Sequence, residues 1–291
     1  MEDKKINIQA ICDGDTSSAT TWMQGLAKYS KHKIEILQWS ANPNKKPDLI
    51  YFTFGSLIHL NEKIVEQHPE IKYGLCVMGA GDFAKIVGWG KVVYPYLSKL
   101  SGAIVLGTRY DAIFKKYIKD VPTYICDIAV DTTMFVRKPS PEHFVIGYAE
   151  NSTYPPTDST LNRFLGYGFP VIMAGSGKGV DKNFIEMPGF YESISVFADS
   201  ITDPRPGGLM FLEAGAVGRP VVCMRKGIMA DWFPPEFLAE DDADMVKKLT
   251  KLRDEPEYYN YASTFWHELA KSRDYSIIVK DYDAAFEAMM K

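Results

Sequence analysis

The chain has 291 residues, of which 46% are hydrophobic and 24% are charged. This composition is typical of a globular protein and excludes a wholly disordered or fibrous chain. The formal net charge of -4 gives no overall sign of a nucleic-acid coat or a polybasic membrane binder. At roughly 150 residues per domain, the length predicts two domains or one large one.

The N-terminal segment and the cysteines indicate the cellular compartment in which we expect the protein. Charged residues lead directly into the short alternating segment 6–12, which lacks the long apolar core of a signal peptide. No stretch approaches the roughly 18 apolar residues of a membrane span, so we expect a cytoplasmic protein. The cysteines lie far apart and match no paired metal-ligand spacing, which predicts reduced, mostly buried thiols and no bound metal. They are Cys12, Cys76, Cys126 and Cys223.

Strand-like and helix-like segments alternate along the first half of the chain. Turn and cap residues from Gly14 to Ser17 separate the first strand from the first helix. Apolar runs and period-two segments predict the strands, and apolar residues at helical spacing predict the helices. The predicted strands are 6–12, 33–39, 49–54, 73–78, 103–106 and 123–128, and the predicted helices are 22–29 and 111–118.

The alternation stops at the proline-containing segment 137–142, which is the best candidate for a domain boundary, and then restarts. Two runs of alternating strands and helices predict two parallel sheets, each in a Rossmann-like domain. Ligands of such domains sit at the carboxyl ends of the strands, here in a cleft between the domains. In the second half we predict strands 144–148, 171–174, 194–197 and 221–224, a helix 209–217, and a mostly helical tail from 242.

Segment 203–222 carries the most information about function. A loop rich in proline and glycine opens a helix, and the N–H groups of its first turn suit an anion such as phosphate. Gly207 and Gly208 allow a ligand to approach the backbone closely. Glu213 stands inside an otherwise apolar helix, where an acid is costly unless it is hydrogen-bonded. A buried helix that ends at Gly218, with Glu213 reaching solvent, explains the same pattern equally well.

This segment resembles the nucleotide-sugar motif of the retaining GT-B glycosyltransferases, in particular family 4. The resemblance implies that Glu213 binds the ribose hydroxyls of a donor nucleotide. It also implies that the backbone from Gly207 to Leu209 approaches the donor sugar and its diphosphate. The matching residues are Gly208, Leu209, Glu213, Ala214, Gly218, Pro220, Val221 and Val222.

Weaker similarities extend the resemblance over most of the chain, at 103–108, 125–135, 144–148 and 275–282. They imply an α/β protein of the GT-B type, in which two Rossmann-like domains face a central cleft and a C-terminal helix crosses back to the first domain. The implied divisions are an acceptor-side domain 1–137, a donor nucleotide-sugar-binding domain 138–271, and a C-terminal helix 272–291 that packs on the first domain.

The chain departs from the family pattern at charged positions. The family has a second glutamate eight positions before Glu213, and this chain has Arg205 there, which leaves the donor sugar open. The bases that follow the first donor-domain strand in the family are absent from 149–156. We expect Arg205, Lys178 and the helix N-terminus to meet the charge of the departing diphosphate. The glycine-rich run around Lys178 also fits a plain turn.

The first domain offers fewer candidates. Where the family often has a histidine near the sugar, this chain has segment 78–82, and Asp82 is the nearest polar side chain. We expect Asp82 and Arg205 to be the catalytic candidates, although Asp82 fits a helix cap equally well. Further residues that we expect to face the cleft are Gly14, Asp15, Arg109 and Asn151.

These observations predict a glycosyltransferase that moves a hexosyl or pentosyl group from a nucleoside-diphosphate sugar to an acceptor hydroxyl. The resemblance implies a retaining reaction in which bases and helix dipoles stabilise the departing diphosphate, so we expect it to need neither metal nor cofactor. A nucleotide-sugar epimerase or a phosphorylase could share the fold, and a degenerate, non-catalytic GT-B protein that only binds a ligand is a further alternative.

The acceptor stays open among a glycan, a small molecule and DNA. A phage-type transferase that modifies hydroxylated DNA bases is the nucleic-acid alternative. It would use lysines of the first domain to follow phosphates, and an ordinary solvated surface explains the same lysines. They are Lys4, Lys5, Lys31, Lys33, Lys45, Lys46, Lys115, Lys116 and Lys119.

Overall fold

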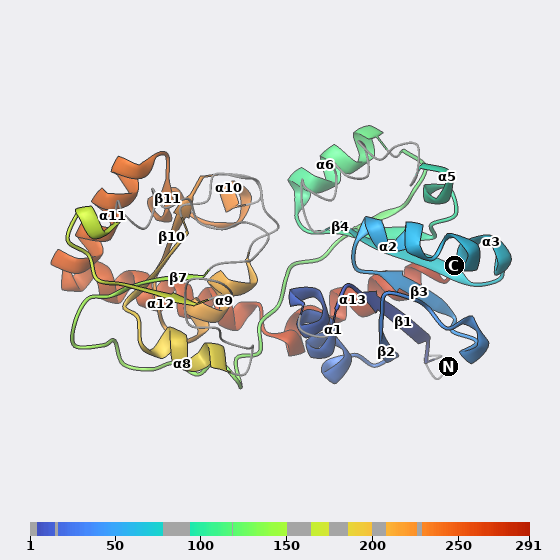
Figure 1. Ribbon diagram of the computed structural model, residues 1–291, viewed down its shortest axis with the longest axis horizontal. Coiled ribbons are helices and arrows are strands. Elements are labelled where there is room, and N and C mark those ends of the chain that lie inside the picture. The colour runs from blue at the N-terminus through green and yellow to red at the C-terminus, as the bar shows by residue number, and fades with distance from the viewer. Residues whose placement is uncertain are drawn as a thin grey trace. The chain divides into compact units, whose positions relative to one another are not determined.

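The protein folds into two compact units, each built around one parallel sheet with helices packed on it (Figure 1). The first unit comprises the described residues up to Ile128 and the C-terminal segment from Tyr275, and the second unit comprises the described residues between Ala129 and Asp274. The predicted α/β class with two parallel sheets is confirmed. The computed structural model describes residues 5–14, 17–77, 94–117, 119–149, 164–174, 186–199, 208–225 and 229–291.

The sheet of the first unit has six strands in the order β2-β1-β3-β4-β5-β6, all of them parallel. Strands β3 and β5 are buried at every position, as the continuous apolar run of β3 predicts. The strands are β1 (Asn7–Cys12), β2 (Lys33–Gln38), β3 (Leu49–Phe52), β4 (Lys72–Val77), β5 (Gly102–Val105) and β6 (Thr123–Ile125).

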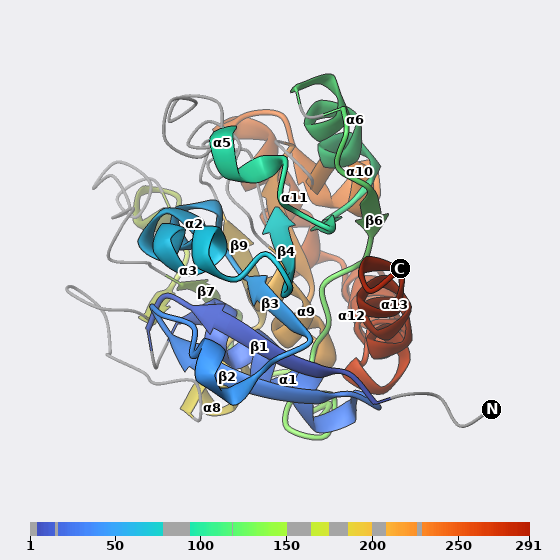
Figure 2. The ribbon, with the colours of Figure 1, turned by 90° about the vertical axis from the view of Figure 1, so that its right-hand side faces the viewer.

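Helices cover both faces of this sheet (Figure 2). Leu57, Val65 and Phe114 bring α2, α3 and α6 onto one face in a single apolar core. On the other face Trp22 of α1 makes an edge contact with Tyr282 of α13, so the C-terminal helix belongs to this unit, as predicted. The helices are α1 (Ser18–Tyr29), α2 (Gly55–Leu60), α3 (Glu62–Gln67), α5 (Tyr94–Leu97), α6 (Thr108–Tyr117) and α13 (Tyr275–Met289), with a short 3-10 turn at Pro43–Lys45.

The sheet of the second unit has five parallel strands in the order β11-β10-β9-β7-β8. The strands are β7 (Ile146–Ala149), β8 (Val171–Ala174), β9 (Val196–Asp199), β10 (Val221–Met224) and β11 (Leu238–Ala239). The helices are α8 (Met187–Glu192), α9 (Leu209–Ala216), α10 (Met229–Trp232), α11 (Asp242–Asp254) and α12 (Pro256–Ser272), with a 3-10 turn at Pro235–Phe237.

Every strand predicted from the sequence is present, with ends that differ by three residues or fewer. The sequence analysis missed the short elements, because helices of four to six residues and a strand of two residues are too short to show a periodic pattern. The missed elements are α2, α3, α5, α8, α10 and β11.

The two segments where the chain changes units are tied to each other. The amide of Val130 donates to the Arg273 carbonyl at 3.0 Å, and the hydroxyl of Thr132 donates to the Asp274 carboxylate at 2.6 Å. These bonds attach the first residues of the second unit to the residues that directly follow α12. The domain boundaries expected from the sequence, after residues 137 and 271, stay predictions.

The structure can be compared with the predictions made for the cysteines and for membrane-spanning helices. All four cysteines are free and buried, as predicted, and burial raises the pKa of the Cys126 thiol to about 12. This thiol therefore stays protonated at neutral pH and is a poor nucleophile. Within the described ranges, no helix combines the length and apolarity needed to cross a membrane.

Candidate functional site

Helix α9 begins at the carboxyl edge of the second sheet, because it follows β9 in a run of parallel strands and helices. The residue before it, Gly208, has φ of 136° and ψ of -36°. Side chains disfavour this backbone conformation, so a glycine is required at the point where the helix starts. The Gly208 carbonyl accepts from the Leu212 amide at 2.9 Å and closes the first turn.

The first turn of α9 presents backbone donors. The amides of Leu209, Met210 and Phe211 precede the first intrahelical bond, and Gly208 has no side chain to cap them. The helix dipole adds partial positive charge at this end. Leu209 and Met210 are half-buried, whereas the helix is fully buried from Phe211 onward. This turn is therefore the part of α9 that a ligand can reach, and its chemistry suits an anion.

Glu213 lies in the body of α9 and is only 3% exposed. The hydroxyl of Tyr191, on α8, donates to Glu213 Oε2 at 2.8 Å. Burial raises the pKa of the Glu213 carboxyl to about 7, and the Tyr191 hydrogen bond acts in the opposite direction. The alternative in which Glu213 reaches solvent is wrong, because the packing between α8 and α9 encloses it.

The Glu213 carboxyl is suited to bind hydroxyl groups. The Cα–Cβ bonds of a helix tilt toward its N-terminus, so the Glu213 side chain leaves the backbone in the direction of the first turn of α9. An ionised carboxylate offers about four acceptor positions, and Tyr191 occupies one of them. With a pKa of about 7, the group changes charge in the physiological range, which is common for residues of functional sites.

Buried contacts fix Tyr191 in place. Its ring makes edge contacts with Phe135, Phe190 and Phe197. Arg219, itself 1% exposed, donates from Nε to the Tyr191 carbonyl at 2.9 Å. The same guanidinium donates to the Lys138, Pro139 and Glu192 carbonyls, so this buried cation has a hydrogen-bonding partner for each nitrogen.

The far end of α9 is clamped against α12. A Cβ at Gly215 would lie 2.7 Å from the Trp266 carbonyl oxygen, so the two helix backbones are in direct contact there. Ser263 Oγ donates to the Gly218 carbonyl at 2.7 Å, and His267 Nδ1 lies 2.9 Å from the Ala216 carbonyl oxygen. These contacts hold α9 rigidly, so that its first turn is presented from a fixed element.

The residues predicted for the site fall into three groups. The structure brings Gly208, Leu209 and Glu213 together on α9. Gly14 and Arg109 belong to the other unit, where Gly14 follows β1 with φ of 150° and Arg109 lies in the first turn of α6. The remaining predicted residues lie outside the described part of the chain: Asp15, Asp82, Asn151, Lys178, Arg205 and Gly207.

The sequence analysis missed Tyr191, which bonds to Glu213, and Arg219, which bonds to the Tyr191 carbonyl. The proline of the Met187–Glu192 segment at the start of α8 is a usable helix-start signal. The pairing of Tyr191 with Glu213 joins residues 22 positions apart across a crossover, and no local pattern encodes it.

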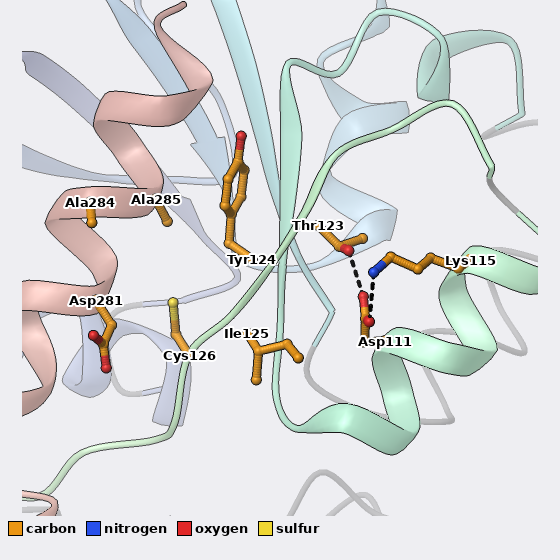
Figure 3. A pocket seen from close by; sticks show the side chains of 9 residues that line it. All are labelled: Asp111, Lys115, Thr123, Tyr124, Ile125, Cys126, Asp281, Ala284 and Ala285. Atoms are coloured by element: carbon orange, nitrogen blue, oxygen red, sulfur yellow. Dashed lines mark hydrogen bonds and ion pairs between the residues drawn. The ribbon is translucent and has the colours of Figure 1, made fainter.

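The structure has two further cavities, and neither is lined by Gly208 or Glu213. One, of about 400 Å³, is bounded by α6, β6 and α13, and Figure 3 shows Asp111 bonded there to Thr123 and Lys115. The other, of about 420 Å³, lies beside Arg219 and Ser263, at the opposite end of α9 from Gly208. Among the described residues, no group of three or more His, Cys, Asp or Glu side chains is arranged to hold a metal ion.

Comparisons with known proteins support one fold for the whole chain. No family model matches the sequence, and no curated protein sequence matches it. Among solved structures, HepE from Anabaena in complex with UDP and glucose is similar with a TM-score of 0.76, over 97% of this chain and 99% of that one, at 13% identity. The chain has the GT-B fold.

Other GT-B structures agree. Sucrose-phosphate synthase from Thermosynechococcus elongatus is similar with a TM-score of 0.73 at 11% identity, over 96% of this chain and 98% of that one. A glycosyltransferase from Rickettsia africae has a TM-score of 0.73 at 10% identity, over 99% of this chain and 100% of that one. The predicted GT-B fold is confirmed, and at these identities the likeness concerns the fold.

Proposed function

We propose that this chain is a glycosyltransferase that binds a nucleoside-diphosphate sugar where α9 begins and transfers the sugar to an acceptor hydroxyl. The observation that carries the proposal is the arrangement on α9, where Gly208 leaves the first turn without a side-chain cap from the described residues and the carboxyl of Glu213 is buried. It is supported by the GT-B fold, since HepE, which shares that fold, has been crystallised with UDP and glucose.

In this proposal, residues of α9 and residues outside it bind different parts of the donor. The backbone at Gly207, Gly208 and Leu209 approaches the diphosphate, to which the amides of the first turn donate. Glu213 accepts hydrogen bonds from the two ribose hydroxyls, while the Tyr191 hydroxyl donates to Glu213 Oε2. Lys178 and Arg205 add positive charge around the diphosphate.

The reaction relies on positioning and on stabilising the leaving group. In this proposal the transfer retains the configuration of the sugar and needs no metal, because cations and backbone dipoles balance the charge of the departing diphosphate. Arg205 and Asp82 are the residues proposed to act at the reacting centre. The acceptor binds on the side of the first unit.

The DNA-modifying alternative is less well supported. It needs unpaired lysines on the first unit, yet Lys31 pairs with Glu287, Lys45 with Glu35, and Lys115 with Asp111. A phosphate-tracking surface would have to break these pairs. A non-catalytic ligand-binding protein remains the competing account, and it shares the donor site but not the release of nucleoside diphosphate.

A ligand screen followed by a turnover assay tests the proposal. UDP-, GDP-, ADP- and CDP-sugars are screened for a rise in melting temperature, and the expected result is a rise with at least one of them. Glu213→Ala should lose that rise, whereas Glu268→Ala, at an exposed acid on α12, should keep it. If no donor shifts the wild-type protein, the proposed function is wrong. Binding without any release of nucleoside diphosphate would favour the non-catalytic account.

A further inference from the structure

Trp39 has an unusual backbone conformation at the carboxyl edge of the first sheet. It directly follows β2 and has φ of 64°, in the left-handed region that bulky residues avoid. Its neighbours close a three-residue turn around it, with the Ser40 amide donating to the Gln38 carbonyl at 2.7 Å. Tight turns of this kind with positive φ are rare and strained. The sequence alone placed Trp39 as the last residue of a strand 33–39, which is wrong.

Buried hydrogen bonds hold the strained turn in place. The Trp39 amide donates to the Cys12 carbonyl at 2.9 Å. Asn61, 1% exposed, donates from Nδ2 to the Trp39 carbonyl at 2.9 Å, and its Oδ1 accepts from the Ala41 amide at 2.8 Å. Strained residues persist where their surroundings impose the conformation, and they gather at functional sites.

The turn presents the indole ring to solvent rather than to the core. Trp39 is 51% exposed, whereas Trp22 of the same unit is 1% exposed. Its ring reaches over the end of β1, because a Cβ placed on Gly14 would lie 4.0 Å from Trp39 Cζ2. The exposed ring therefore lies beside Gly14, a residue that the sequence predicted to face a ligand.

Polar residues flank Trp39 in the chain, and the lysine of the turn that follows is paired with an acid. Lys45, in the turn after Trp39, pairs with Glu35 of β2, so this lysine is not free for phosphates. Two buried oxygens at the ends of β1 and β2, Asp13 Oδ1 and Gln38 Oε1, have no hydrogen-bond partner among the described residues. Both are acceptors, and they belong to the residues that precede Gly14 and Trp39 in the chain.

We propose that Trp39 is a stacking platform for a carbohydrate acceptor, held in place by Asn61 at the carboxyl edge of the first sheet. The inference rests on the proposed function, since it names the acceptor class of that transferase. The negative face of an indole ring attracts the polarised C–H groups on the flat face of a pyranose ring.

Trp39→Asn is the informative substitution. Asparagine tolerates the left-handed conformation, so the melting temperature should stay the same or rise, while the platform is lost. The wild-type protein is applied to a printed array of oligosaccharides, and the best-binding oligosaccharide is then titrated by calorimetry. We expect Trp39→Asn to weaken binding about tenfold or more, and Trp39→Tyr to restore most of it. Ile125→Thr, at an exposed apolar residue on the opposite edge strand β6, is the matched control and should bind normally.

The outcomes separate this proposal from the donor site. Because the donor is proposed to bind the second unit, Trp39→Asn should keep the full thermal shift with the nucleotide sugar. The platform is refuted if Trp39→Asn binds the oligosaccharide as well as wild type, if no oligosaccharide on the array binds, or if the substitution instead abolishes binding to an oligonucleotide duplex. If the wild-type protein binds no nucleotide sugar, that result counts against the proposed transferase function and not against the role of Trp39 alone.

Discussion

Replacing Glu213 by Gln tests the account of the buried carboxyl without donor or acceptor. Burial raises the pKa of this carboxyl from 4.5 to about 7. The folded state therefore binds the proton more tightly than the unfolded state. The wild-type protein keeps its full stability below pH 4.5 and loses stability as the pH rises toward 7. The full loss corresponds to about 3 kcal/mol.

Glutamine resembles the protonated acid and still accepts from the Tyr191 hydroxyl. Urea unfolding of wild type and Glu213→Gln at pH 4.5 and at pH 8 measures the effect. The variant should gain stability relative to wild type between the two pH values, by about 3 kcal/mol. Glu268→Gln, at an exposed acid paired with Lys271, should change by less than about 1 kcal/mol. An equal difference between wild type and Glu213→Gln at both pH values would refute the buried, proton-binding carboxyl.

Further predictions concern the same helix. The affinity for the nucleotide donor should rise about tenfold from pH 6 to pH 8 in wild type, as the Glu213 carboxyl ionises, and stay flat in Glu213→Gln; titration calorimetry at both pH values checks this. Tyr191→Phe keeps the ring contacts but removes the hydroxyl donor, so the Glu213 pKa should rise further and donor binding at pH 7 should weaken, with recovery at pH 9. Gly215→Ala should lower stability by about 1–3 kcal/mol in a denaturation experiment, because the added methyl group meets the Trp266 carbonyl oxygen. Chelation by EDTA should leave sugar transfer unchanged, and a loss of rate restored by a divalent cation would contradict the proposed metal independence.

The sequence predicted the parts of the fold that depend on local pattern. β3 and β10 are short apolar runs, and each is buried at all four positions. The position of Glu213 within an apolar helix followed from its neighbours in the chain. Its enclosure by Tyr191 did not, because that contact depends on how the crossover through α8 packs. Such a pairing is a property of the tertiary structure.

The sequence-based prediction for Trp39 was wrong for a different reason. Period-two alternation favours Trp39 as the end of a strand, yet the hydrogen bonds of Asn61 turn the chain at Gln38. The residue that imposes the turn lies 22 positions further along the chain, in the segment that joins α2 and α3. Alternation within the strand therefore carried no sign of the turn.

A crystal structure of the protein with UDP bound tests the central claim most directly. The account predicts that both ribose hydroxyls lie within hydrogen-bond distance of the Glu213 carboxylate. It also predicts that a phosphate oxygen accepts from the amides of the first turn of α9, next to Gly208. UDP bound at another place, with Glu213 still enclosed by Tyr191 and touching no part of the nucleotide, would contradict it.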